Sequence, residues 1–467
     1  MFVMTTSGLP YVNVIAQHSE VTGSSFLLYI RLSDGEIVQG MLDCGIFQEP
    51  NYDEENEKLL LDDPKQLDFV LVTHTHVDHC GRIPLLYRRG YEGSVHCTYN
   101  TAMLMPHALH DTAKILKERA KKLKHKVLFG DGDVVDTMKG LIPHNYLKPF
   151  YLGSQRSIKI TFLPNGHLLG AAMILMEVEG KTNLLFTGDY HDHNVFFEVE
   201  DIPEKIKQLP VTIICESTYG DTSVQELEHE VNFESNVEEA LKKQKSVLLP
   251  AFSLGRTQEI LYRIRKLQEV SEVLYDTPIY LDGNLGITYT DIYHSGALQG
   301  LKSDMQDFLP HNFFIVKDND MRMELVSNTK PKIIVTSSGM GKYGPAQFYI
   351  PEFLKRKEMS LIQFSGYCAE GTYGRELKED EQYQDIVKSS SEFSAHGRKE
   401  VLLGLIQQFQ NVRSVIINHG NTETKEHFKE YVAENTGIKK IEIASQQDAY
   451  RVGQYGIMKH LTMIKNT

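Results

Sequence analysis

Five short apolar runs in the chain each lead into a polar residue that could take part in chemistry. They are Phe69–Val72 before His74, Ile158–Leu163 before His167, Leu184–Phe186 before Asp189, Val211–Cys215 before Glu216, and Val415–Ile417 before His419. Runs of this length, bounded by turn-forming residues, predict buried strands. Rigid scaffolds present reactive side chains on loops at the ends of strands, so the pattern predicts a strand-built core with its chemistry at the strand ends.

The middle of the chain alternates strand-like runs with loops and helices. The run Ser246–Phe252 precedes Gly255-Arg256 and a helix whose apolar residues recur at helical spacing: Ile260, Leu261, Ile264 and Leu267. Two further runs, Lys332–Thr336 and Leu361–Ser365, each precede a Gly-containing loop, Ser337–Met340 and Gly366–Gly374. This alternation predicts a mostly parallel α/β segment over about 200–395. Residues 1–60 differ, because Asp34-Gly35 separates two apolar runs and predicts a hairpin.

Composition places the chain among ordinary globular proteins, with 41% hydrophobic and 24% charged residues over a length of 467. That length allows two or three domains. No run approaches the roughly 18 apolar residues of a membrane helix, and the first ten residues, MFVMTTSGLP, lack the pattern of a secretory signal. The five cysteines are an odd number, are widely spaced and form no CxxC pair, which argues against disulfides and a cysteine-ligated zinc. We therefore expect a soluble protein of the reducing cytoplasm, with no membrane partner.

The net charge of −13 argues against a protein that coats nucleic acid without specificity. It does not exclude an enzyme with a local basic groove. The segment 114–126, KILKERAKKLKHK, holds seven Lys or Arg and one Glu, so the charge is uneven along the chain. An isolated charge run of this kind is most often a solvated helix face.

The strongest chemical signal is H-x-H-x-D-H, formed by His74, His76, Asp78 and His79 directly after a predicted strand. A single histidine in such a place is usually a satisfied core residue, but burying four titratable groups together without a metal would be costly. In an extended turn, His74 and His76 would point to one side and Asp78 and His79 to a neighbouring position. The motif therefore predicts ligands for two adjacent metal ions.

His167, Asp189 and His419 complete what a dinuclear site needs, namely a third imidazole for each metal and one carboxylate able to bridge them. Ligands of this type, without thiolates, suit zinc, and also manganese or iron. A hydroxide held between metals about 3.5–4 Å apart is a nucleophile at neutral pH and can attack phosphorus in line.

Seven motifs, in order, give the chain its resemblance to a known family: Asp43 in MLDCG, THTHVDH, His167, Asp189, Glu216 in CESTYGD, His396 in FSAHG, and His419 in NHG. With them, the sequence resembles the β-CASP branch of the metallo-β-lactamase superfamily, RNA-processing nucleases that include the nuclease subunit of cleavage and polyadenylation specificity factor and its bacterial homologues. The resemblance implies an α/β fold in which a metallo-β-lactamase αββα sandwich, residues 1–200 and 396–467, carries an inserted Rossmann-like β-CASP domain at 201–395.

The resemblance also implies a role for each motif residue. His74, His76 and His167 would bind one zinc ion, and Asp78, His79 and His419 the other. Asp189 would bridge the two ions, and Asp43 would support the site from beside or behind the ligands. His396 would act as general acid, oriented by Glu216, because a neighbouring carboxylate favours the imidazolium form.

One position departs from the family pattern. Many members carry Asp two residues after the motif histidine, whereas SAHGR places Arg398 there. The departure bears on how His396 is oriented, although Arg398 could also bind phosphate. Further substrate contacts are expected in a cleft between the two domains, from Arg256, Ser338 of the SSGM stretch, Arg375 and the basic segment 114–126.

The leading hypothesis is a ribonuclease with two zinc ions that cleaves single-stranded RNA endonucleolytically and leaves 5′-phosphate and 3′-hydroxyl ends. Asp43 lies near the start, and 48 residues follow His419, which leads us to expect a bare catalytic core without accessory RNA-binding domains. A homodimer is compatible with such a core, because a second subunit would widen the basic surface. The alternatives are a 5′-to-3′ exoribonuclease, a DNA nuclease of the same family, and an inactive RNA-binding scaffold, which would typically have lost metal ligands. A small-molecule hydrolase would not need the insertion.

Overall fold

The computed structural model describes residues 8–17, 21–48, 52–224, 233–341, 343–366, 368, 371–390, 393, 395–446 and 448–462. The chain divides into two compact units. The first unit comprises Met1–Asn194, Val199–Val224 and Ala395–Thr467, and the second comprises Val195–Glu198 and Gln225–Ser394. The N-terminal segment considered as a signal, and the loop 366–374, lie partly outside the described residues.

In its described residues, the first unit contains two mixed sheets of eight and seven strands. The order of the first sheet is β21 (Gly456–Thr462), β20 (Asp448–Gly453), β1 (Tyr11–Gln17), β2 (Ser25–Arg31), β3 (Ile37–Cys44), β4 (Phe69–Leu71), β5 (Val95–Thr98) and β6 (Leu141–His144). The order of the second is β19 (Ile441–Ile443), β18 (Asn411–Ile417), β11 (Pro210–Cys215), β10 (Thr182–Phe186), β9 (Ala172–Val178), β8 (Ile158–Pro164) and β7 (Phe150–Leu152). The strands predicted before His74, His167, Asp189, Glu216 and His419 are therefore confirmed as β4, β8, β10, β11 and β18.

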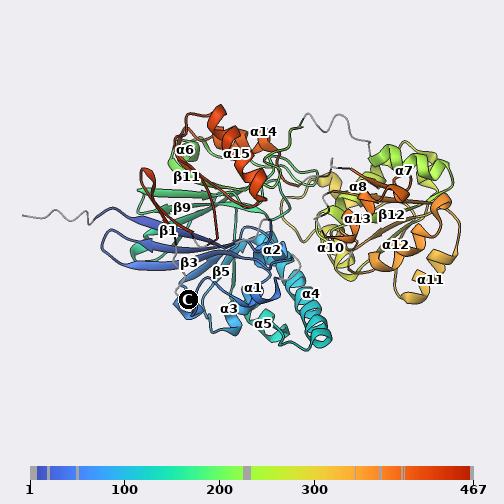
Figure 1. Ribbon diagram of the computed structural model, residues 1–467, viewed down its shortest axis with the longest axis horizontal. Coiled ribbons are helices and arrows are strands. Elements are labelled where there is room, and N and C mark those ends of the chain that lie inside the picture. The colour runs from blue at the N-terminus through green and yellow to red at the C-terminus, as the bar shows by residue number, and fades with distance from the viewer. Residues whose placement is uncertain are drawn as a thin grey trace, which may run out of the picture. The chain divides into compact units, whose positions relative to one another are not determined.

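The strands of this unit are apolar on both faces, and successive side chains enter two different cores: Phe26 and Leu28 lie between the sheets, whereas Leu27 lies under the helices. Figure 1 shows the resulting layers. Phe26 pairs with Leu42 across the antiparallel β2–β3 hairpin, and both side chains are buried between the two sheets, together with Phe162 and Ile174 of the second sheet. A hairpin around Asp34-Gly35 is thereby confirmed. Because the C-terminal strand β20 pairs with β1, with Val452 opposite Val12, the end of the chain completes the sheet that its beginning starts.

Helices cover the outer face of each sheet, which gives the expected αββα sandwich. The first sheet is covered by α3 (Ile83–Arg88), α4 (Tyr99–Leu123) and α5 (Asp131–Lys139), whose apolar residues share a core with that sheet. The second sheet is covered by α6 (Glu204–Lys207), α14 (Lys399–Gln407) and α15 (Thr422–Asn435). Figure 1 shows these layers.

The second unit is a parallel sheet with helices on its faces, as the alternation of runs predicted. In the part that the structure describes, its order is β14 (Phe313–Ile315), β13 (Ile279–Asp282), β15 (Ile333–Thr336), β12 (Ser246–Pro250), β16 (Ser360–Phe364) and β17 (Val387–Ser389), and all pairings are parallel. The surrounding helices are α7 (Phe233–Lys242), α8 (Arg256–Gln268), α9 (Glu272–Tyr275), α10 (Asn284–His294), α11 (Asn319–Ser327), α12 (Ala346–Leu354) and α13 (Tyr373–Glu379).

Two details differ from the sequence interpretation. The strand expected over Ser246–Phe252 ends at Pro250, because the carbonyl of Phe252 turns away to accept hydrogen bonds from the amide and hydroxyl of Thr257 at the start of α8. The insertion was expected to begin at residue 201, but residues 201–224 carry β11, which pairs with β10 and β18 of the first unit.

Two further expectations concerned the state of the cysteines and the presence of membrane-spanning helices. All five cysteines are free and buried, and Cys44 and Cys80 pack in the apolar core between the first sheet and its helices. None of the helices in the described ranges has the length and apolar character needed to cross a membrane.

Candidate metal centre

The H-x-H-x-D-H motif lies where β4 meets a short helix, α2 (Val77–Cys80). His74 and His76 lie on the extended segment, whereas Asp78 and His79 lie in the first turn of α2. The expectation of one extended turn was therefore wrong for its second half. The helical turn is what separates the four side chains into two groups, because the chain changes direction after His76.

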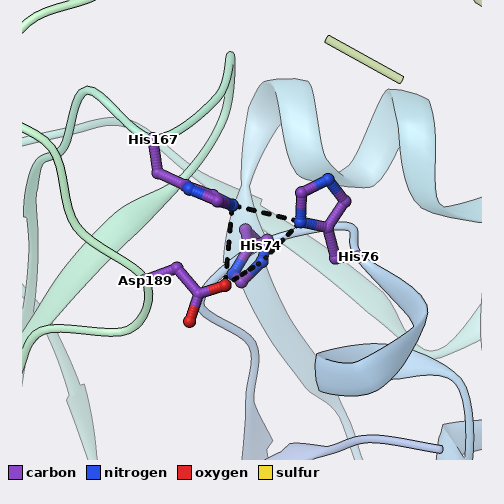
Figure 2. Close-up of side chains that lie close together, drawn as sticks. All are labelled: His74, His76, His167 and Asp189. Carbon is purple, nitrogen blue, oxygen red and sulfur yellow. Dashed lines mark hydrogen bonds and ion pairs between the residues drawn. The ribbon is translucent and has the colours of Figure 1, made fainter. Parts of the chain in front are cut away.

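The first group consists of His74, His76, His167 and Asp189 (Figure 2). Nδ1 of His76 lies 3.2 Å from Nε2 of His74 and 3.1 Å from Nε2 of His167. The Oδ2 atom of Asp189 lies 3.5 Å from Nε2 of His74 and 3.6 Å from Nε2 of His167. Four donor atoms from three segments of the chain thus point at a common position.

Hydrogen bonds on the far side of two rings orient their lone pairs toward that position. Nδ1 of His167 lies 2.8 Å from the carbonyl of Ala395, which can only accept, so the ring proton is on Nδ1. The hydroxyl of Thr73 donates to Asp43 and therefore accepts from Nδ1 of His74, at 3.0 Å. Nε2 of both rings is consequently a lone-pair donor.

Burial also keeps these imidazoles in the neutral form that binds metal. It lowers the pKa of His74 and of His167 well below the usual value, with the neighbouring imidazoles adding to the effect and Asp189 opposing it. Burial lowers the pKa of His76 as well. Neutral rings with facing lone pairs repel one another, and a cation at the shared position would remove that repulsion.

The second group consists of Asp78, His79, His419 and Asp189. The Nε2 atoms of His79 and His419 lie 3.3 Å apart, and Oδ2 of Asp78 lies 3.9 and 4.0 Å from them, respectively. Nδ1 of His79 donates to Asp43 at 2.8 Å, and Nδ1 of His419 lies 3.0 Å from the Thr218 hydroxyl. The second group therefore also has converging donors with hydrogen bonds behind its rings. It differs in charge, because Asp189 and Asp43 outweigh burial and raise the pKa of His79 well above its usual value.

Asp189 belongs to both groups, with Oδ2 toward the first and Oδ1 3.2 Å from Nε2 of His79 in the second. Its side chain is only 2% exposed, and Oδ1 is buried without a hydrogen-bond partner. Burial would raise the pKa of this carboxyl, but His419, His79 and His396 outweigh it and hold the pKa well below the usual value. An ionised carboxylate with an orphaned oxygen between two imidazole groups fits a pair of bridged cations.

Asp43 lies behind the second group rather than among the converging donors. Its carboxylate accepts from the Thr73 amide and the Thr73 hydroxyl, both at 2.8 Å, and from His79. Its backbone φ is 55°, and that of His419 is 50°, a left-handed conformation that costs energy for residues other than glycine. Such strain is typical of functional positions that surrounding contacts hold in place.

His396 and Glu216 lie beside the first group. Nδ1 of His396 is 3.0 Å from Oε2 of Glu216, and its Nε2 is 3.7 Å from Oδ2 of Asp189, so the ring edge faces the converging donors. The amides of Tyr190 and Thr218 also donate to Glu216, which is 1% exposed. Burial alone would lower the pKa of His396, but Glu216 and Asp189 outweigh it and raise the pKa to about 9.

None of the positively charged and polar residues expected at the substrate is among the converging donors of this cluster. Arg398 is buried and donates to the Ser223 carbonyl at 2.9 Å, and His396 keeps its contact with Glu216 although Arg398 replaces the family's Asp. Arg256, Ser338 and Arg375 belong to the second unit, where Arg256 pairs with Glu259 at 2.9 Å and Arg375 with Glu379 at 2.6 Å. The amide of Ser338 donates to the Tyr343 carbonyl. Substrate contact by these residues stays a prediction.

Several contributors were not identified from the sequence. Thr73 and Thr218 each hold a histidine of the cluster, and the carbonyl of Ala395 holds His167. The two threonines are adjacent to motif residues, in THTH and ESTYG, which is the signal that could have found them. The Ala395 carbonyl has no such signal, because any residue supplies a carbonyl.

Family models match most of the chain. Residues 20–191 match the metallo-beta-lactamase superfamily, residues 257–377 the Beta-Casp domain, and residues 386–444 the Zn-dependent metallo-hydrolase RNA specificity domain. With the αββα sandwich and the His/Asp cluster, these matches define a metal-dependent hydrolase fold. The chain belongs to the β-CASP branch of the metallo-β-lactamase superfamily, a family of hydrolases that includes ribonucleases.

Similar proteins come from bacteria and archaea. Ribonuclease TTHA0252 of Thermus thermophilus is 30% identical over 427 residues, which cover 86% of this chain and 91% of that protein. An RNase J-like protein of Methanocaldococcus jannaschii is 33% identical over 395 residues, covering 81% and 86%. The transcription termination factor FttA of the same organism is 29% identical over 431 residues, covering 84% of this chain, and the chain spans 64% of that factor's length.

The fold is also found in a solved structure of low sequence similarity. A protein of unknown function from Enterococcus faecalis V583 aligns with a TM-score of 0.55 and 12% identity, covering 97% of this chain and 99% of that chain. At this identity the likeness concerns the fold alone.

Proposed function

We propose that the chain is a zinc-dependent ribonuclease that cleaves single-stranded RNA internally and leaves 5′-phosphate and 3′-hydroxyl ends. The observation that carries the proposal is the sharing of Asp189 between two groups of converging donors, with the His396–Glu216 pair beside them. The match of residues 386–444 to an RNA specificity domain and the ribonuclease name of the Thermus relative support RNA as the substrate.

In this proposal His74, His76 and His167 would hold one zinc ion, Asp78, His79 and His419 would hold a second, and Asp189, which belongs to both groups of donors, would contribute to both. When bound, such a pair of ions activates water for attack on phosphorus and offsets the charge of the phosphate. Asp43, Thr73, Thr218 and the Ala395 carbonyl orient the imidazoles, so that little reorganisation is needed when the ligands bind.

His396 supplies the proton that the leaving group needs. Attack on phosphorus breaks the bond to the 3′ oxygen of the preceding nucleotide, and that oxygen must gain a proton to become a hydroxyl. Nδ1 of His396 donates to Glu216, which leaves Nε2, on the side of Asp189, to deliver the proton. Because the pKa of His396 is about 9, the imidazolium is the main form at neutral pH.

The test is cleavage of internally labelled and 5′-labelled single-stranded RNA by the purified protein, beside Asp189→Ala, with metal content measured on both. We expect internal fragments from the wild type only, and about two zinc ions per chain. Release of mononucleotides from the labelled 5′ end would instead identify an exoribonuclease, and cleavage of DNA in preference to RNA a DNA nuclease. Full metal occupancy without cleavage of either polymer would contradict the proposal.

A further inference from the structure

One face of helix α4 carries a row of cationic and titratable side chains. The row consists of His107, His110, Lys114, Lys117 and Lys121, spaced alternately by three and four residues, and Lys124 is the C-cap just beyond the end of the helix. Residues at this spacing lie above one another on a single helix face. The helix core face, with Leu109, Ala113 and Ala120, lies roughly opposite, so the row faces away from the sheet.

The lysines of the row are not neutralised by ion pairs within the protein. Lys114, Lys117 and Lys121 are exposed, and none of the ion pairs between described residues involves them. By contrast, Arg119 on another face of the same helix pairs with Asp53 at 2.9 Å. Two acidic residues, Asp111 and Glu118, flank the row on one side. The chain as a whole has a net charge of −13, so the lysines of this row form a local patch of opposite charge.

The start of α4 is attached to the metal centre. The hydroxyls of Thr98, the N-cap, and Thr101 both donate to the carbonyl of Gly170, three residues after His167. Gly170 has a φ of 97°, and a Cβ there would lie 2.7 Å from the Thr101 amide nitrogen, so the contact requires glycine. From this end, the helix runs away from α2 (Figure 1).

The geometry of the row suits an extended polyanion. At 1.5 Å per residue, Lys114 lies about 20 Å from Thr101 along the helix and Lys121 about 30 Å. One cation per helical turn, on a helix whose start is anchored beside the His167 loop, provides a series of contacts for successive phosphates. Such contacts position a chain without reading its bases.

We propose that this row binds the phosphate backbone of single-stranded RNA at nucleotides distant from the scissile bond. The inference rests on the proposed ribonuclease function and names the surface that holds the rest of its substrate. An acidic protein partner would use similar charges, but the regular spacing along one helix favours a polymer with evenly repeated charge.

The experiment compares K114Q/K117Q/K121Q with K242Q/K243Q/K245Q, a control on and just after α7 that changes the net charge equally. Lys242 and Lys243 already pair with Glu238 and Glu239, which makes the control cluster a poorer phosphate site. RNA binding is measured by fluorescence anisotropy over a range of salt concentrations. The slope of log K against log salt should become less steep by about 2 in the row variant, since each contact with a single strand contributes about 0.7, and should stay unchanged in the control.

Cleavage of substrates of different length gives a second readout. The ratio of kcat/KM for a long RNA to that for a trinucleotide, which is too short to reach Lys114, should fall in the row variant through a rise in KM for the long RNA. Equal salt slopes and equal ratios for the two variants would overturn the inference. If the wild type binds RNA through the row but cleaves no RNA, the RNA-binding surface is supported and the ribonuclease function is overturned. The failure of the row and the failure of the ribonuclease function therefore give different results.

Discussion

At the scale of single residues, one buried carboxylate, that of Asp43, connects the two groups of candidate ligands. It accepts from His79 of the second group directly, and from the Thr73 hydroxyl, which in turn accepts from His74 of the first group. The protonation of one imidazole in each group is therefore set by the same side chain. Glu216 has the corresponding role for His396: with Asp189 it raises the pKa of that ring to about 9, just as Asp189 and Asp43 raise the pKa of His79 well above its usual value.

Replacing Glu216 with Gln should move the alkaline limit of activity to lower pH. The carboxylate raises the pKa of His396 to about 9, so the proton-donating form is present below that pH and is lost as the pH rises through it. Without the negative charge, the pKa falls and the loss begins earlier. The measurement is kcat/KM against pH at saturating zinc, with metal content as the control. An alkaline limb that does not move would contradict a proton-donating role for His396.

Replacing Thr218 with Val should weaken the second group as a metal site. The Thr218 hydroxyl lies 3.0 Å from Nδ1 of His419, and loss of such a partner typically costs 10–100-fold in metal affinity. Titration with zinc should show one site weakened by that factor and the other little changed. The control is Thr222→Val, four residues further along, whose hydroxyl contacts Asp221 and not a ligand. Equal affinities in the two variants would remove Thr218 from the site.

At the scale of elements, Arg82 ties helix α2 to the N-terminal strands. It lies directly after α2, is completely buried, and donates to the carbonyls of Gly45 and Lys58 and to side chains on β1 and β2, Gln17 and Ser25. The same region brings Gly45 so close to α2 that a Cβ there would lie 1.5 Å from the Asp78 carbonyl oxygen. These contacts fix the turn on which Asp78 and His79 lie.

Replacing Arg82 with Met should destabilise the first unit by at least about 3 kcal/mol, because several buried acceptors lose their donor at about 1–3 kcal/mol each. Arg82→Lys should retain only part of the stability that Arg82→Met loses, since lysine lacks the planar fork of donors. The measurement is the urea midpoint of unfolding. Arg88→Met is the matched control: its partner Asp133 is 3.7 Å away across a half-exposed pair, so we expect a change within about 0.5 kcal/mol. Similar midpoints for Arg82→Met and the control would refute the role.

At the scale of the whole molecule, the candidate ligands all lie in the first unit but come from distant parts of the chain. They are contributed by residues 74–79, 167, 189 and 419, which follow strands of both sheets. Metal bound there would hold the two sheets of the sandwich together. No candidate ligand of the two groups lies in the second unit.

Removal of zinc by a chelator should therefore lower the melting temperature of the first unit and leave a transition of the second unit in place. Ligand at 1,000 times its Kd stabilises the native state by about 4 kcal/mol. Calorimetry of the zinc-loaded and chelated protein would measure the shift, and Asp189→Ala should be much less sensitive to the chelator. An identical thermogram with and without zinc would contradict metal binding by the folded sandwich.

Much of this architecture could be predicted from the sequence because its signals are local. Short apolar runs identified β4, β8, β10, β11 and β18, and the ligand types after them identified the cluster. The helical start at Val77 was missed, since four residues are too few to show helical periodicity. The end of β12 was missed for a similar reason: its apolar run continues into a loop that tertiary hydrogen bonds hold.

The sequence by itself therefore determined which residues are candidate metal ligands and which strands precede them, because both depend on residue type and short spacing. Only the tertiary structure decided which ring nitrogen of each histidine faces inward, because a partner such as the Ala395 carbonyl lies 228 positions away from His167. It also decided that the start of α4, the helix that carries the lysine row, is held by the carbonyl of Gly170. Both depend on contacts between segments far apart in the chain, which no local pattern encodes.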